Sequence, residues 1–466
     1  MEKLREDRVF YYFNKLLEIP RPSGHEKAVS DFLIQTGKEL GLECKQDESL
    51  NVVLKRKASP GYENSPGVIL QGHMDMVAAK ASGSDHDFTK DPIIPLVEGD
   101  FLKAKDTSLG ADNGIAVAMG LALLEDENYK GPSLELLVTT EEETSMAGAL
   151  NLREDFLDGS YLINVDSEEE GILTVGSAGG LTVFIKEEIG ETSEKSGYKI
   201  SLSGLLGGHS GMQINEARGN SIKILGELLE KLGQDILIGD FMAGSLDNVI
   251  PSEGEVKVFG ANIEDIEKAR DEVIKNHQDL LGDLKIDISE TEGKFYSKDL
   301  SHRLIKLINN VPTGVYCFME NSETVEASNN LAFIKDNGKS LTSEISVRSS
   351  NHEKLDELTE KITKVLDENN FSYELGSKYP GWEYNEDSKL RPLAQKIYKD
   401  HFGKEFETIV IHAGLECGAI FEKYPEMDII SIGPDITGAH SIEEKVDINS
   451  VKRVYDYIKL LIENIK

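Results

Sequence analysis

Apolar residues in the first 180 positions form two patterns: some recur at helical spacing, and others form the short continuous runs that are typical of buried strands. The helical spacing predicts a helix over residues 7–19, which the segment Pro20-Arg21-Pro22-Ser23-Gly24 ends. Further helices are predicted at 25–40 and 115–124, and strands at 51–55, 68–70, 134–138 and 161–165. Strands that alternate with helices favour an α/β fold with a mainly parallel or mixed sheet.

The pattern changes near residue 185 and changes back after Trp382. Strands at 198–202, 236–238, 255–260 and 284–288 and helices at 221–232, 263–280, 304–309 and 352–366 are typical of an α+β unit of ferredoxin-like type. A strand at 427–432 and a helix at 450–465 follow. We therefore expect a discontinuous first domain, 1–185 and 376–466, with a second domain inserted at 186–375. The glycine-rich segment Gly176–Gly180 is interpreted as a flexible link between them.

Composition narrows the possible functions. The chain has 466 residues, 39% of them hydrophobic, which is long for a single hydrophobic core and suggests two domains. Its 84 acidic and 50 basic residues give a net charge of −34. Such a surface repels phosphate backbones and anionic lipid, so nucleic acid and membrane partners are not expected. Three cysteines without a CxxC pair fit a reducing compartment. With no apolar run of membrane-spanning length and a charged N-terminus, we expect a cytoplasmic protein.

Candidate metal ligands recur where apolar runs end. His73 follows the predicted strand at 68–70, and alternation places Asp75 on the same side, where a carboxylate can fix the imidazole tautomer. Two histidines and three carboxylates of this kind could hold two divalent ions, a clamp that polarises a scissile carbonyl and activates a bridging water. Glu142 could serve as its base. The five donors are His73, Asp112, Glu143, Asp166 and His440.

Seven motifs between residues 72 and 448 carry a resemblance to a known family: GHMDMV, LGADNGIAVAMGLALLED, TTEEETSMAGA, NVDSEEEG, GGHSGMQI, HAGLECG and GAHSIEEKVDI. In this order they resemble the dinuclear zinc metallopeptidases related to aminoacylase and glutamate carboxypeptidase, most of all the aminoacyl-histidine (Xaa-His) dipeptidase branch. The resemblance implies a catalytic domain with a mixed sheet flanked by helices, and an inserted domain that acts as a lid and dimerisation module.

The resemblance also implies a role for each donor. His73 and Asp166 would hold one metal ion and Glu143 and His440 the other, with Asp112 as the bridge. The ions would be zinc, with cobalt or manganese as alternatives. Asp75 would orient His73, Glu142 would be the general base, and the Asp112–Asn113 peptide bond would be cis.

The register of the acidic run leaves one alternative open. The family usually has Asp-Glu-Glu-x-Gly where this chain has Glu141-Glu142-Glu143-Thr144-Ser145. Alignment on the following Met146-Ala147-Gly148 makes Glu142 the base and Glu143 the ligand. A shift by one residue would give these roles to Glu141 and Glu142 and reverse which carboxylate faces the metals.

Four further residues are candidates for substrate binding. The resemblance implies that His209 stabilises the oxyanion, often in the site of the partner subunit, and that Asn248 and Arg348 contact the oxyanion or the substrate carboxylate. An ordinary surface salt bridge is the alternative for Arg348. Glu416 could hold a free α-amino group or be structural.

Together these features predict a homodimeric dipeptidase for Xaa-His peptides, with small peptides as its partners. Another amide specificity on the same scaffold, such as an N-acyl amino acid amidohydrolase or a tripeptidase, is the alternative within enzymes. A metal-binding protein without catalysis is the alternative outside them.

Overall fold

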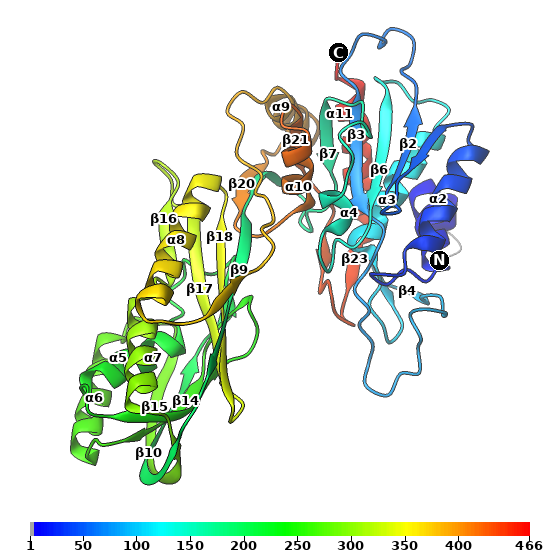
Figure 1. Cartoon of the computed structure of the whole chain (residues 1–466). Coiled ribbons are helices and arrows are strands. Elements are labelled where there is room, and N and C mark those ends of the chain that lie inside the picture. The colour runs from blue at the N-terminus through cyan, green and yellow to red at the C-terminus, as the bar shows by residue number, and fades with distance from the viewer. Residues whose placement is uncertain (1–3) are drawn as a thin grey trace. The chain divides into compact units, whose positions relative to one another are not determined.

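The computed structural model describes residues 4–466 and divides into two compact units (Figure 1). The first comprises the chain up to Gly176 together with Trp382–Val410 and Leu415–Lys466. The second comprises Ser177–Gly381 with Ile411–Gly414, and the predicted insertion, 186–375, lies within it. No helix within residues 4–466 is long and apolar enough to cross a membrane.

A mixed sheet forms the centre of the first unit and confirms the α/β prediction. Strand β3 is parallel to both of its neighbours, β6 and β7, and β21 continues the parallel part beside β7. The pairs β1–β2 and β2–β6 are antiparallel. In spatial order the strands are β1 (Glu43–Gln46), β2 (Val52–Arg56), β6 (Leu134–Thr139), β3 (Val68–His73), β7 (Tyr161–Asn164), β21 (Asp428–Ser431), β8 (Ile172–Ser177) and β20 (Glu407–Ile411).

Helices cover both faces of this sheet because successive strand side chains point to opposite sides. Val68 and Leu70 of β3 belong to the core beneath α1, α3 and α11, whereas Ile69 packs with Cys417 and the core beneath α4 and α10. Cys417 is thus a packing residue. The helices of this unit are α1 (Arg8–Leu17), α2 (Lys27–Glu39), α3 (Ala111–Glu125), α4 (Ala147–Leu150), α9 (Leu390–Phe402), α10 (Glu416–Lys423) and α11 (Ile448–Glu463), with a short 3-10 helix, η1, at Leu4–Glu6.

A small antiparallel sheet adjoins the loop that carries His440. Its order is β22 (Ile436–Thr437), β23 (Lys445–Asp447), β5 (Phe101–Ala104) and β4 (Pro95–Glu98). His440 lies in the connection between β22 and β23, so the pairing of β23 with β5 fixes one end of that loop against residues from the N-terminal part of the chain.

The second unit is an α+β unit built on an antiparallel sheet. Helices pack on the sheet through apolar faces, for example Leu355, Leu358 and Ile362 of α8. The strands run β15 (Gly282–Phe295), β10 (Ser193–Leu205), β14 (Gly254–Phe259), β12 (Leu237–Gly244), β17 (Val325–Asp336), β18 (Ser340–Ser349), β9 (Gly179–Glu188) and β19 (Tyr373–Leu375), with β16 (Gly314–Phe318) beside β17. The helices are α5 (Ser221–Lys231), α6 (Ile263–Asn276), α7 (Lys298–Asn310) and α8 (His352–Glu368), and β11 (Gly208–His209) pairs with β13 (Val249–Ile250).

The segment Gly176–Gly180 lies where the two units divide, as expected of a link, but it consists mostly of strand residues rather than of an irregular segment. Strand β8 ends at Ser177 and β9 begins at Gly179, with Ala178 between them, and the Gly180 amide donates to Tyr379 O at 3.0 Å. A Cβ on Gly179 would lie 2.3 Å from the Gly381 nitrogen, so glycine here permits close backbone packing rather than flexibility. Both segments lie where the two compact units divide.

Candidate metal centre

The ends of three parallel strands bring the predicted ligands together. His73 is the last residue of β3, Glu143 follows the end of β6, and Asp166 follows the end of β7. Because these strands are parallel, their carboxyl ends meet at one edge of the sheet, the usual place for a site in an open α/β fold. Asp112 at the start of α3 and His440 from the β22–β23 loop complete the group.

The five donors form two overlapping sets that share Asp112: His73, Asp112 and Asp166, and Asp112, Glu143 and His440. In each set the donor atoms lie within 4.8 Å of one another. Asp112 uses its two oxygens separately, with Oδ1 3.2 Å from His73 Nε2 and Oδ2 3.1 Å from His440 Nε2. A carboxylate with one oxygen toward each histidine is placed as a bridge.

Charges in the centre show why it suits cations. Burial raises the pKa of Asp166 well above its usual range. Hydrogen bonds to Asp112 and Glu143 raise the pKa of His440 to about 11. Burial opposes protonation of His73, but its contact with Asp112 and the charge of Asp166 outweigh burial and raise its pKa. The raised pKa values show that these three groups favour a bound proton, because the centre has an excess of carboxylates. A bound metal ion would supply positive charge in place of those protons.

Two observations test whether the residues fit divalent metal ions. Glu143 Oε1 is buried without a hydrogen-bond partner among the described residues, and so it is free to act as a ligand atom. The donor set contains two imidazoles and three carboxylates with no thiolate, which suits a catalytic zinc site and also accepts cobalt or manganese. The residues therefore fit a pair of divalent ions.

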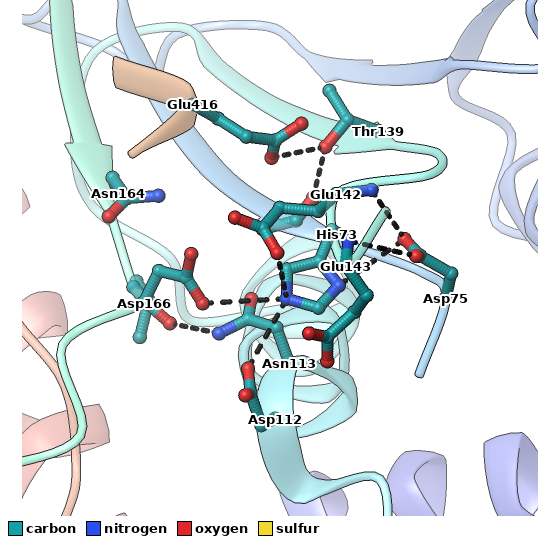
Figure 2. A network of polar contacts seen from close by, with 12 residues as sticks. His73, Asp75, Asp112, Asn113, Thr139, Glu142, Glu143, Asn164, Asp166 and Glu416 are labelled. Carbon is teal, nitrogen blue, oxygen red and sulfur yellow. Dashed lines mark hydrogen bonds and ion pairs between the residues drawn. The ribbon is translucent and has the colours of Figure 1, made fainter. Parts of the chain in front are cut away.

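Asp75 and Glu142 lie beside the ligands, as Figure 2 shows. Asp75 Oδ1 is 3.4 Å from His73 Nδ1, and Ser23 Oγ donates to its Oδ2 at 2.8 Å. The backbone amides of Glu142 and Glu143 also donate to Asp75, at 3.1 and 3.3 Å. One buried carboxylate thus lies beside the imidazole and accepts hydrogen bonds from the turn that carries the two glutamates.

The two glutamates of that turn face different partners. Glu143 Oε2 lies 2.8 Å from His440 Nε2, whereas Glu142 Oε2 lies 3.9 Å from His73 Nε2 and belongs to neither donor set. Burial raises the pKa of Glu142 to about 8. This arrangement favours the register in which Glu142 is the base. As anticipated, the Asp112–Asn113 peptide bond is cis.

Glu416 is completely buried in the first unit. Its Oε2 accepts hydrogen bonds from Gln71 Nε2 at 2.7 Å and Thr139 Oγ1 at 2.6 Å, and burial raises its pKa to about 7. Gln71 belongs to β3 and Thr139 to β6, so these hydrogen bonds join Glu416 to two strands of the sheet, as a structural role requires. Recognition of an amino group by Glu416 stays a prediction.

The other three candidates lie in the second unit. His209 on β11 pairs with Val249 on β13, directly after Asn248, and the Ser210 amide donates to Asn248 O at 2.8 Å. Arg348 on β18 donates through Nη1 to Tyr379 Oη at 3.1 Å, while its buried Nε lacks a hydrogen-bond partner among the described residues. That second N–H group can therefore donate to a ligand oxygen.

The surroundings of His209 fix its tautomer. Its Nδ1 accepts hydrogen bonds from the backbone amides of Gly211 at 3.1 Å and Met212 at 3.0 Å. Burial and the charge of Arg348 lower its pKa, which favours the neutral ring. A neutral imidazole whose Nδ1 accepts must carry its proton on Nε2, and that N–H is available to donate.

Sequence reasoning missed two fully buried residues next to the centre, Arg21 and Glu444. Arg21 donates to backbone carbonyls at three positions near the ligands, and Glu444 accepts from the four amides of residues 109–112. In the sequence, Arg21 stands in the helix-breaking segment and Glu444 in the last of the seven motifs. The residues around them do not indicate which distant backbone groups they bind.

The comparisons with known proteins agree with this geometry. Residues 69–464 match the family described as peptidase family M20/M25/M40. The chain belongs to this peptidase family. It is 34% identical to the cytosol non-specific dipeptidase of Escherichia coli K12, over 100% of this chain and 99% of the relative. As a family member, it is a hydrolase of peptide bonds.

Solved structures support the same fold over the whole chain. The aminoacylhistidine dipeptidase of Vibrio alginolyticus is 34% identical, with a TM-score of 0.90 over 98% of this chain and 96% of that one. A tripeptidase from Staphylococcus aureus has a TM-score of 0.57 at 18% identity over 99% and 98% of the two chains, and shows the shared fold alone.

Proposed function

We propose that this chain is a metal-dependent dipeptidase that cleaves dipeptides with a free amino end, Xaa-His dipeptides among them. The observation that carries the proposal is the pair of donor sets that share Asp112, with Glu142 beside them but outside both. The names of the two relatives at 34% identity, one a non-specific dipeptidase and one an aminoacylhistidine dipeptidase, support it.

Two divalent cations, which we propose to be zinc, would polarise the scissile carbonyl and acidify a water molecule between them. His73 and Asp166 would hold one ion, Glu143 and His440 the other, and Asp112 both. Glu142 would take the proton of the attacking water and return it to the leaving amine. Its position, 3.9 Å from His73 Nε2 and outside both donor sets, suits a base that is not itself a ligand.

Residues of the second unit would recognise the substrate. His209 would donate from Nε2 to the oxyanion, and Asn248 and Arg348 would bind the oxyanion or the terminal carboxylate. We further propose that the protein is a cytoplasmic homodimer in which this unit mediates contact. Exposed apolar side chains next to His209 and Asn248 support a contact surface there: Leu206, Met212 and Leu246.

The test is a peptide panel. Purified protein, stripped of metal and reloaded with zinc, cobalt or manganese, is assayed on Xaa-His dipeptides, other dipeptides, their N-acetyl forms and tripeptides. A dipeptidase cleaves the free dipeptides and fails on the acetylated ones. Preference for acetylated substrates would instead indicate an N-acyl amino acid amidohydrolase, and preference for tripeptides a tripeptidase. No hydrolysis with any of the three metals would refute the proposal in favour of a non-catalytic metal-binding protein.

A further inference from the structure

The carboxylate of Glu444 is bound by four consecutive backbone amides. It is 2% exposed, its Oε2 accepts from Leu109 N at 2.6 Å and Gly110 N at 2.9 Å, and its Oε1 accepts from Ala111 N at 2.8 Å and Asp112 N at 3.2 Å. Helix α3 is assigned from Ala111, but Asp112 and Asn113 have non-helical backbone angles, and no side chain at the N-cap position, Gly110, accepts from the amides of this segment. Glu444 satisfies these amides from a distant part of the chain.

Arg21 holds the same loop from its carbonyl side. It is also 2% exposed, and its Nη2 donates to Gly110 O at 2.5 Å. Its Nη1 donates to Met74 O at 2.8 Å and to Asp75 O at 3.1 Å, in the segment directly after His73. One rigid guanidinium therefore joins the backbone that carries His73 to the backbone that leads to Asp112.

Glycine at position 110 lets this contact form. Gly110 has φ +72°, and a Cβ there would lie 2.6 Å from Arg21 Nη2 and 2.8 Å from the sulfur of Met76. A side chain at this position would displace the guanidinium from the loop. The close approach and the left-handed backbone thus both require glycine.

We propose that Arg21 and Glu444 are positioning residues that set where Asp112 stands between His73 and His440, and thereby the separation of the two metal ions. The inference rests on the proposed pair of metal ions. Neither residue belongs to a donor set, so each acts through the backbone. Glu444 binds the amide of Asp112, and it is also the last residue of the loop that bears His440. Arg21 instead joins the loop before α3, at Gly110, to the segment that follows His73.

Removal of Glu444 and removal of Arg21 should each lower the affinity for a different metal ion. The ion between Glu143 and His440 depends on Glu444 through both Asp112 and His440. The ion at His73 and Asp166 depends on Glu444 through Asp112 alone. Partners of metal ligands typically contribute 10–100-fold to metal affinity. Removal of the Glu444 carboxylate should therefore weaken one ion much more than the other.

The test is Glu444→Gln, titrated with Co²⁺ as metal-free protein and followed by visible absorption and by elemental analysis. Glutamine keeps the shape but turns an NH₂ group toward two of the four amides. Wild type should take up two ions. The variant should bind one ion nearly as wild type does and the second about 10–100-fold more weakly. The matched control is Glu443→Gln, because Glu443 is the exposed neighbour and its variant should titrate as wild type.

A second variant keeps the inference testable if Glu444→Gln does not fold. In Arg21→Lys, a single ammonium group cannot reach three carbonyls, and the ion at His73 and Asp166 should be the one that weakens. Equal affinities for both ions in both variants, within threefold of wild type, would overturn the inference while the proposed function stands. Equal weakening of both ions would also overturn it, since a purely structural role predicts that result. A wild-type protein that takes up no ion would overturn both proposals.

Discussion

Two adjacent glutamates show how a single position decides chemical role. Glu142 and Glu143 both donate backbone amides to Asp75, so one carboxylate anchors the turn, yet their side chains separate toward His73 and His440. Neighbouring residues on an extended or turning backbone project in different directions. A ligand and a base can therefore stand next to each other in sequence without competing for the same place.

Glu142→Ala should keep both metal ions and lose hydrolysis. The side chain belongs to neither donor set, and loss of a general base typically lowers rate by about 10²–10⁴-fold. Metal content by elemental analysis, measured beside turnover of a dipeptide, checks this.

Glu141→Ala is the matched control for this variant. The Glu141 carboxylate accepts a hydrogen bond from Ser145 Oγ at 3.0 Å and belongs to neither donor set, so the variant should retain activity. If Glu142→Ala loses metal while Glu143→Ala retains it, the register of the acidic run is shifted by one residue.

His412 should make the second unit less stable in acid. Burial, followed by the charge of Arg348, lowers the pKa of His412 to about 4, and its Nε2 lies 2.7 Å from Ser328 Oγ. Between pH 6.5 and pH 4 the unfolded chain binds a proton that the folded chain does not. The free energy of unfolding must then fall as pH falls, by up to about 3 kcal/mol for this group.

Urea unfolding at pH 7 and at pH 5 measures the effect. His412→Gln keeps a hydrogen-bonding group of similar length but removes the titration, so the variant should lose less stability between these two pH values than wild type does. An identical loss in both proteins would show that the pKa of His412 does not differ between the folded and the unfolded state.

At the scale of elements, strand β3 and helix α3 determine how closely His73 approaches Asp112. A Cβ on Gly72 would lie 2.2 Å from Asn113 Oδ1 and 2.9 Å from the Ala116 Cβ, so the helix rests directly on the strand backbone. Asn113 Nδ2 donates to Val165 O at 2.7 Å and joins the helix to the end of the neighbouring strand as well.

Gly72→Ala should weaken both the fold and the metal centre. Overpacking of this kind typically destabilises by about 1–3 kcal/mol, and it would move α3 away from the strand end. Gly120→Ala is the matched control, because a Cβ there would meet the Leu136 side chain on the same helix–sheet interface, away from the ligands. Thermal unfolding should show destabilisation in both variants, and metal content should fall in Gly72→Ala alone. Full metal content in Gly72→Ala would refute the coupling.

Helix boundaries show what local signals convey. Helix α7 begins at Lys298 rather than at 304, and Ser297 accepts from Leu300 N at 3.1 Å, so an N-cap residue was present in the sequence but not used. The predicted helix at 263–280 ends at Asn276, and His277 is its C-cap. In both cases the helix was predicted, and only its ends differ.

At the scale of the whole molecule, the proposed dimer can be tested by complementation. The proposed metal ligands lie in the first unit and His209 in the second. His209→Ala should lower turnover with metal content unchanged, since the residue contacts no ligand group. If each site takes His209 from the partner subunit, a mixture of His209→Ala and Glu142→Ala chains should recover part of the activity.

Each mixed dimer would then contain one site with an intact Glu142 and a donated His209. Subunit exchange is verified with two distinguishable tags before the assay. The control mixture combines Glu142→Ala with itself under two tags and should remain inactive. No recovery despite proven exchange would show that His209 acts within its own chain or not in catalysis at all.

The sequence by itself predicted β2, β3, β6 and β7, most helices, and five candidate donors at strand ends or in loops, because periodicity and residue chemistry are local properties of the chain. Only the tertiary structure decided which partners meet. The Glu444 carboxylate accepts from the Asp112 amide across 332 positions, Arg21 donates to Gly110 O across 89, and no local pattern encodes such pairs. Gly179 and Gly180, which sequence placed in a flexible link, lie instead in a packed strand because Tyr379–Gly381 lies against them. Their conformation is set by long-range packing, which residue spacing along the chain does not express.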